Sequence, residues 1–107
     1  MAKHLYLYRG GEMKSTPEEQ QAVMAEWQAW FETMGSKVVD MGAPFQGSKW
    51  VKTEGVTDGT MSADSVTGYS IVEATSFDEA AEWAKTCPNL KDGGSVEVMD
   101  PMPMPGM

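Results

Sequence analysis

Two capping boxes fix where helices begin in this chain, and they limit the possible folds more than any other feature. The first is Thr16-Pro17-Glu18-Glu19 and the second is Ser76-Phe77-Asp78-Glu79. In each, a hydroxyl residue is followed three positions later by glutamate, a pattern that satisfies free amide groups in the first helical turn. Pro17 also suits the first helical position, where no amide hydrogen bond is lost. The chain therefore contains two helices with well-defined starts.

The first helix is predicted over residues 17–34 and has one apolar face. On a helical wheel its large apolar side chains fall within about 120° of arc. They are Val23, Met24, Trp27, Trp30, Phe31 and Met34. Gly35 then occupies the position that commonly ends a helix. The second helix is predicted from Phe77 to about Cys87, since Pro88 stops it. Its predicted inner face is Phe77, Ala80, Ala81 and Ala84, whose small residues let the helix lie close to a sheet.

Five segments show the composition and alternation typical of strands. They are residues 4–8, 37–41, 48–53, 69–74 and 95–99. In the first, Leu5 and Leu7 point to one face of the sheet. His4, Tyr6 and Tyr8 point to the other, so both faces need cover.

The order of these elements predicts an α+β fold. Glu54-Gly55 and Asp58-Gly59 are expected as turns, with a polar loop over 59–66. The order then reads as two βαβ-like halves, which predicts a ferredoxin-like βαββαβ sandwich with two helices on one face of an antiparallel sheet. An open apolar face on a domain of this size is usually covered by a second copy. We therefore expect a homodimer with facing sheets, that is, a dimeric α/β barrel.

Composition limits the domain count and the possible partners. At 107 residues the chain is one domain, which we place at residues 1–100, with residues 101–107 as an extended Pro/Met-rich arm. The formal charge is 8 − 16 = −8. This excludes a basic footprint for nucleic acid and argues against binding an anionic membrane surface. We expect no cofactor and no metal, because one cysteine and one histidine form no ligand cluster and a methionine tail alone is a weak copper site.

The N-terminal apolar run, about five residues long, is too short for a signal peptide. No stretch approaches the ~20 apolar residues of a membrane span. The expected location is therefore cytoplasmic, with Cys87 reduced.

A series of short motifs in the second half of the chain resembles the YCII-related domain family. The motifs are Gly68-Tyr69-Ser70-Ile71-Val72-Glu73-Ala74, Phe77-Asp78-Glu79-Ala80, Trp83-Ala84, Cys87-Pro88 and Gly93-Gly94-Ser95-Val96-Glu97-Val98. Thr57-Asp58-Gly59 resembles part of the DGPF branch of that family, and Pro17-Glu18-Glu19 with Trp27 also fits. The resemblance covers nearly the whole chain and implies a ferredoxin-like dimeric α/β barrel.

The resemblance implies less about chemistry. Most of the family has no assigned activity, while a dehydrohalogenation-type lyase role on aromatic substrates belongs to part of it. One branch is thought to use a His–Asp acid/base pair whose histidine follows the first strand. The only histidine here, His4, lies inside the first predicted strand.

His4 is the candidate general base, with Asp40 or Asp58 as its acidic partner. An unperturbed imidazole titrates near pH ~6.5, which suits proton abstraction at neutral pH. The competing interpretation is a half-exposed histidine at a strand end. Asp58-Gly59 is equally typical of a turn.

Aromatic residues predict a pocket between sheet and helix. Its candidate ligand-binding residues are Tyr6, Tyr8, Gln20, Trp27 and Tyr69. Such pockets bind flat apolar molecules oriented by a few polar groups. The alternatives are that Trp27 belongs to the core and that Gln20 caps the helix mouth. Cys87 is a poor nucleophile candidate, because the end of a helix disfavours thiolate.

Two functions stay open at this point. The first is a small cofactor-free enzyme doing acid/base chemistry on a small aromatic or carbonyl compound. The second is a non-catalytic dimeric module that binds a ligand or a protein. A cleft holding His4 beside a carboxylate favours the enzyme, and a filled interior favours the module.

Overall fold

The computed structural model describes residues 2–10, 16–60, 62, 64–91 and 93–103. The helices are α1 (Pro17–Met34) and α2 (Phe77–Ala84), with 3-10 turns η1 (Gly35–Lys37) and η2 (Pro88–Leu90). The strands are β1 (Ala2–Arg9), β2 (Val38–Asp40), β3 (Lys49–Lys52), β4 (Gly55–Asp58), β5 (Val66–Ala74) and β6 (Ser95–Met99).

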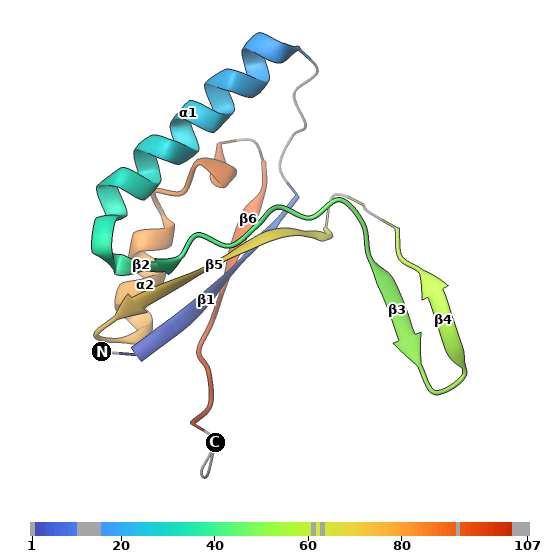
Figure 1. Ribbon diagram of the computed structural model, residues 1–107. Helices are drawn as coiled ribbons and strands as arrows, with labels where there is room; N and C mark the ends of the chain where they lie inside the picture. Colours follow the sequence, from blue (N-terminus) through green and yellow to red (C-terminus); the bar gives the residue numbers. More distant parts are fainter. Residues whose placement is uncertain (1, 11–15, 61, 63, 92, 104–107) are drawn as a thin grey trace.

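Four strands form the main sheet in the order β2-β5-β1-β6, and every neighbouring pair is antiparallel. Each helix connects two strands that are separated in the sheet by one intervening strand. This is the split βαβ arrangement twice over, so the predicted α+β, ferredoxin-like fold is confirmed. Both helices lie on the same side of the sheet (Figure 1).

The hydroxyl half of both predicted capping boxes forms at the start of the helices, and the Glu79 carboxylate accepts from the Thr75 amide at 3.0 Å. The Glu19 amide donates to Thr16 Oγ1 at 3.2 Å, and the Glu79 amide donates to Ser76 Oγ at 3.0 Å. Helix α2 ends at Ala84, earlier than the predicted Cys87. Cys87 has extended backbone angles because it precedes proline, and a residue in that position disfavours the helical region.

Tyr6 lies at the centre of the core between the helices and the sheet. It is fully buried, its ring centroid is 6.2 Å from that of Trp30 on α1, and its hydroxyl donates to the Ala80 carbonyl on α2. Ala80 and Ala84 are also buried, so this part of the inner face predicted for α2 lies against the sheet. Ala81 is exposed and Phe77 is 44% exposed, so the prediction is wrong for these two residues. One strand residue thus contacts both helices, which fixes the layer above the sheet.

The segment expected as turns between the halves contains a strand that the sequence pattern missed. Residues 55–58 form β4, which pairs with β3 in a separate two-stranded sheet. Lys52 pairs with Gly55, and that glycine adopts φ 143°, a value that side chains disfavour. The hairpin projects from the body (Figure 1), and the radius of gyration is 15.4 Å, against about 13 Å for a compact domain of this length.

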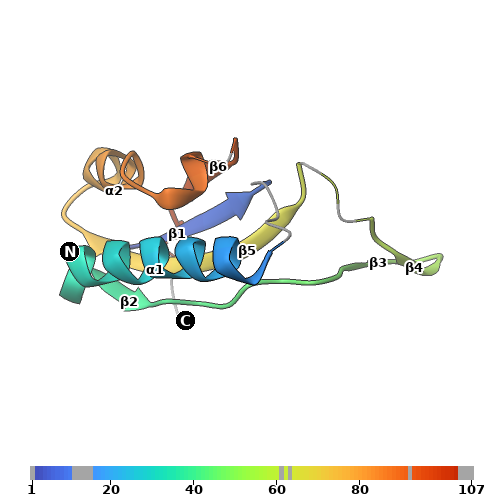
Figure 2. The same cartoon turned by 90° about the horizontal axis from the view of Figure 1, so that it is seen from above.

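The face of the sheet opposite the helices has an apolar centre flanked by charged side chains, which are Lys3, Arg9, Glu73 and Glu97. Leu5, Leu7 and Ile71 lie on it, because the alternation along β1 and β5 buries their neighbours under the helices. At its edges Val39 and Met99 are 46% and 42% exposed. Neither helix of the described structure covers this face (Figure 2).

The C-terminal arm lies partly outside the described residues. Residues 101–103 are exposed and form neither helix nor strand, and residues 104–107 are not described. Within the described ranges, neither helix has the length and apolarity needed to cross a membrane.

Candidate functional site

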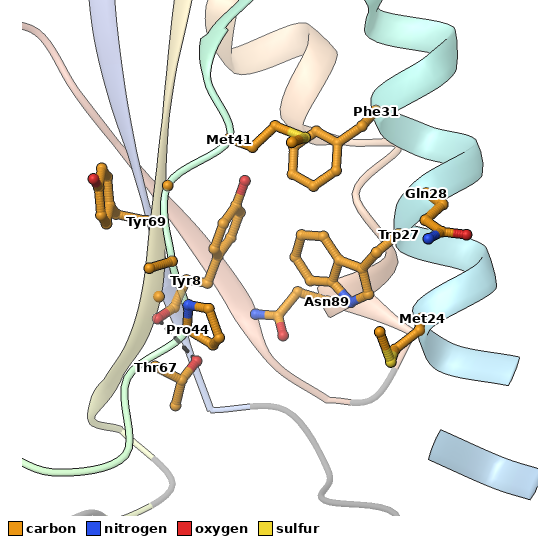
Figure 3. A pocket seen from close by; sticks show the side chains of 13 residues that line it. Tyr8, Met24, Trp27, Gln28, Phe31, Met41, Pro44, Thr67, Tyr69 and Asn89 are labelled. Carbon is orange, nitrogen blue, oxygen red and sulfur yellow. Dashed lines mark hydrogen bonds between the residues drawn. The ribbon is translucent and has the colours of Figure 1, made fainter. Parts of the chain in front are cut away.

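A pocket of about 470 Å³ lies between α1, the connection after β2, and the start of β5 (Figure 3). This volume is within the range of small-molecule sites, roughly 300–1,000 Å³. The lining residues are Tyr8, Met24, Trp27, Gln28, Phe31, Met41, Gly42, Ala43, Pro44, Thr67, Gly68, Tyr69 and Asn89.

One wall consists of side chains from a single stripe of α1. Met24, Trp27 and Phe31 are three and four residues apart, so they share one helical face. The Trp27 ring meets the Tyr8 ring edge-on, with centroids 4.9 Å apart and planes at 77°. Met24 is 62% exposed at the mouth. The predicted apolar face of α1 is therefore divided, with Trp30 and Met34 buried in the core and Met24, Trp27 and Phe31 at the pocket.

The opposite wall is mostly main chain. Gly42 has φ 76°, and a Cβ there would lie 1.8 Å from the Tyr69 carbonyl oxygen. The Tyr69 amide donates to the Ala43 carbonyl at 3.3 Å, and the Phe45 amide donates to the Thr67 carbonyl at 2.8 Å. These contacts hold residues 41–45 flat against β5, which leaves the space open toward α1.

The hydroxyl groups of Tyr8 and Thr67 form hydrogen bonds inside the protein. Tyr8 donates its hydroxyl hydrogen to Ser70 Oγ at 2.8 Å, and Ser70 donates to the Met41 carbonyl at 2.7 Å. Burial raises the pKa of Tyr8 above its ordinary value, so the phenol stays protonated at neutral pH. Thr67 Oγ1 donates to the Tyr8 carbonyl at 3.2 Å.

Asn89 closes the floor of the pocket from η2. Its amide nitrogen donates to the Arg9 carbonyl at 3.1 Å and to the Ser95 carbonyl at 2.9 Å. The side chain is 8% exposed and extends into the space between Tyr8 and Trp27 (Figure 3).

The structure brings some of the predicted ligand-binding residues together. The side chains of Tyr8 and Trp27 line the pocket. Tyr69 lines it too, but its ring points away from the pocket (Figure 3). The ring stacks on Phe45, with centroids 5.9 Å apart. Tyr6 is fully buried in the core, and Gln20 is an exposed residue of the first turns of α1 outside the lining.

The predicted catalytic residues do not meet. His4 is 2% exposed rather than half exposed, and its Nδ1 lies 3.3 Å from Oδ1 of Asp100. Asp40 accepts from the Gly42 amide at 2.8 Å, and Asp58 pairs with Lys49 in the hairpin. The carboxylate found beside His4 is therefore Asp100, a residue to which the sequence pattern gave no role.

His4 has an unusual environment for a buried imidazole. Its ring stacks on Phe77, with centroids 5.8 Å apart and planes at 9°. Neither ring nitrogen has a hydrogen-bond partner within the described part of the chain. The Asp100 contact is close enough for attraction when the ring is protonated, and it lacks the alignment of a hydrogen bond.

Sequence reasoning missed Asn89, Thr67 and the main-chain wall. Asn89 is the only asparagine of the chain, and its place next to Pro88 before a glycine pair was the available signal. Gly42-Ala43-Pro44 has the composition of a loop after a strand, but nothing local shows that it lies against β5.

Other chemistry is limited among the described residues. They contain no group of three His, Cys, Asp or Glu side chains able to hold a metal ion. Cys87 is 2% exposed, and burial raises the pKa of its thiol to about 11. The pocket therefore offers aromatic surface and neutral hydrogen-bonding groups.

Comparison with known proteins agrees with this fold. The structure is similar to that of 5-chloro-2-hydroxyhydroquinone dehydrochlorinase from Burkholderia phenoliruptrix AC1100, solved in complex with 2,5-dihydroxybenzoquinone. The identity is 22%, the TM-score is 0.57, and the match covers 94% of each chain. No curated protein sequence matches. The model of the YCII-related domain matches residues 4–104, and the chain therefore belongs to the YCII-related domain family.

Proposed function

We propose that this chain binds a small, flat aromatic compound in the pocket between α1 and β5. The observation that carries this proposal is the pocket itself, about 470 Å³ with an aromatic wall on one side and a backbone wall on the other. A planar ring fits between such walls, and aromatic pairs gain energy at centroid separations of roughly 4.5–7 Å.

The fold comparison supports the ligand class. The similar dehydrochlorinase is named for a hydroxylated aromatic substrate and was solved with a hydroxylated quinone. At 22% identity the likeness concerns the fold, so hydroxylated rings are the first compounds to test here and not an assigned ligand.

The test is a titration with hydroquinone followed by the tryptophan indole resonances. The chain has four tryptophans, which Trp→Phe variants assign one at a time. Trp27 lines the pocket, whereas Trp50 is 63% exposed on the hairpin and serves as an internal control. We expect the Trp27 indole N–H to shift and saturate while Trp50 stays still. Shifts of equal size at both, or at neither, would contradict the proposal.

The second candidate function is acid/base catalysis on a small aromatic or carbonyl compound. The observation favouring it is His4, whose unpartnered Nδ1 lies 3.3 Å from Oδ1 of Asp100. His4 is buried and is not among the residues that line the pocket, so this candidate requires the compound to reach His4 from outside that pocket. In an elimination of HCl, a base removes a proton as the carbon–chlorine bond breaks and chloride leaves. His4 is the candidate base, with Asp100 now ahead of Asp40 and Asp58 as its partner.

Chloride release from a chlorinated hydroquinone separates the two candidates. If the protein is an enzyme of this kind, the unaltered protein should release chloride and the His4→Gln variant should not. The matched control Asp58→Asn should still release chloride. No release by either protein would leave a non-catalytic binding module.

We also propose that a second copy covers the open sheet face, giving the dimeric α/β barrel. The support is the apolar centre of that face, formed by Leu5, Leu7 and Ile71. Light scattering should give twice the 11.7 kDa chain mass, and Ile71→Lys should return the single mass. A single mass for the unaltered protein would refute the dimer.

A further inference from the structure

We propose that the pocket selects ligands that present an O–H or N–H donor to Asn89, and that it rejects anions. This inference rests on the proposed function, because it specifies the ligand class of the same pocket. It follows from how the polar side chains of the lining use their own hydrogens.

Asn89 carries the argument. Both hydrogens of its amide nitrogen are directed at main-chain oxygens, those of Arg9 and Ser95, at 3.1 and 2.9 Å. These two bonds fix which end of the amide is nitrogen. The group that remains for a ligand is Oδ1, which only accepts hydrogen bonds.

The packing around Gly94 holds this orientation. A Cβ on Gly94 would lie 2.6 Å from Asn89 Nδ2 and 2.7 Å from the Arg9 carbonyl oxygen. Only glycine at position 94 leaves room for the Asn89 amide nitrogen beside the Arg9 carbonyl. The packing just before β6 therefore fixes the nitrogen end of the amide and leaves Oδ1 as the end available to a ligand.

The hydroxyl hydrogens of the neighbouring Tyr8 and Thr67 are also used in hydrogen bonds inside the protein. Tyr8 donates to Ser70, and Thr67 donates to the Tyr8 and Gly10 carbonyls at 3.2 and 3.4 Å. Each hydroxyl has one hydrogen, so what each offers a ligand is an acceptor lone pair. Three polar side chains on the sheet side of the pocket thus present acceptors.

The charges of the chain point the same way. None of the described residues lining the pocket is Lys, Arg or His, and the formal net charge is −8. The donors on the lining side chains are the Trp27 indole N–H and the Gln28 amide, both from α1. These two neutral donors do not offset the free-energy cost of desolvating a carboxylate that faces hydrogen-bond acceptors.

Two kinds of head group supply the required donor: a neutral hydroxyl and a cationic ammonium. The aromatic wall also suits a cation, through attraction to ring faces. The experiment therefore compares four probes of similar size by NMR titration of the unaltered protein: phenol, anisole, benzylamine and benzoate.

We expect phenol to bind about tenfold tighter than anisole, because the ether leaves a buried acceptor unpaired. Benzoate should not bind at concentrations that saturate phenol. The ratio of phenol to benzylamine affinity identifies the preferred donor. Equal affinities for phenol and anisole, or tight benzoate binding, would overturn this inference while leaving the proposed function standing. No binding by any probe would instead refute the proposed function.

A pair of variants tests whether Asn89 causes the preference for phenol over anisole. Asn89→Ala should lower phenol affinity to that of anisole, with anisole unchanged. Gln21→Ala, an amide loss at an exposed α1 position outside the lining, should alter neither. A phenol preference that survives Asn89→Ala would contradict the role of Asn89. If that variant does not fold, the probe series on the unaltered protein still decides the ligand class.

Discussion

Removing the hydroxyl of Tyr8, and separately that of Tyr6, should give variants with equal stability and unequal binding. The two tyrosines are two residues apart on β1 and point to the same face. Both are buried, at 6% and 0% exposure. Each donates one internal hydrogen bond, Tyr8 to Ser70 and Tyr6 to the Ala80 carbonyl. Only Tyr8 lines the pocket.

The expected stability loss follows from one hydrogen bond in each case. Tyr→Phe keeps the ring and its packing, so each variant should lose about 1 kcal/mol of unfolding free energy. For a domain near 100 residues this lowers Tm by about 4–8 °C. Urea and thermal unfolding followed by circular dichroism measure both quantities.

Ligand affinity should separate the pair. Tyr8→Phe removes an acceptor from the pocket and frees Ser70 to turn. The affinity for hydroquinone, whose second hydroxyl can donate to this acceptor, should therefore fall several-fold, about 1 kcal/mol. Tyr6→Phe should bind hydroquinone as the unaltered protein does. If both variants lose affinity equally, the effect passes through stability and Tyr8 has no contact role. If neither loses affinity, the ligand does not meet this end of the pocket.

Three further outcomes follow from individual residues. The Cys87 thiol, with its pKa raised to about 11 from an ordinary 9.0, should resist Ellman's reagent at pH 8 in the folded protein. Since the unfolded thiol loses its proton first, unfolding free energy should fall as pH rises from about 9 to 11; a flat profile would show no such burial cost. His4→Leu should raise the unfolding free energy by about 1 kcal/mol in urea, because it removes two unpartnered buried nitrogens, and a loss instead would show that the Asp100 contact stabilises the fold. Gly42→Ala should cost more than about 2 kcal/mol, since its Cβ meets the Tyr69 carbonyl at 1.8 Å, whereas Gly47→Ala, with nothing within 4 Å, should cost little; equal losses would refute the account of the pocket wall.

The elements governed by local rules were predictable from the sequence. The capping boxes at Thr16 and Ser76 set the helix starts, because a cap is made within four residues of chain. Alternation along β1 separated Tyr6 and Tyr8 from Leu5 and Leu7 correctly. The order of elements then sufficed for the ferredoxin-like fold, since short connections leave few topologies.

The parts that depend on distant contacts were not predictable. Asn89 has its role because it donates to the Ser95 carbonyl, six residues away, and to the Arg9 carbonyl on β1, 80 residues away. Of the two interpretations of His4, neither foresaw its burial, because Phe77, which stacks on the ring, comes from the other half of the chain. Strand β4 was read as turns because its residues pair only with β3 and bury nothing, so no alternation marked them.

The most direct test of the account is to find where a bound ring lies. The protein would be labelled at the methionine methyl groups, and nuclear Overhauser contacts to phenol ring protons recorded. Met24 and Met41 line the pocket, whereas Met34 is 5% exposed in the core and Met102 is 79% exposed on the arm. The account predicts contacts from the ligand to Met24 and Met41 and none to Met34 or Met102. Contacts to Met102 alone, or none to the pocket pair at saturation, would contradict it.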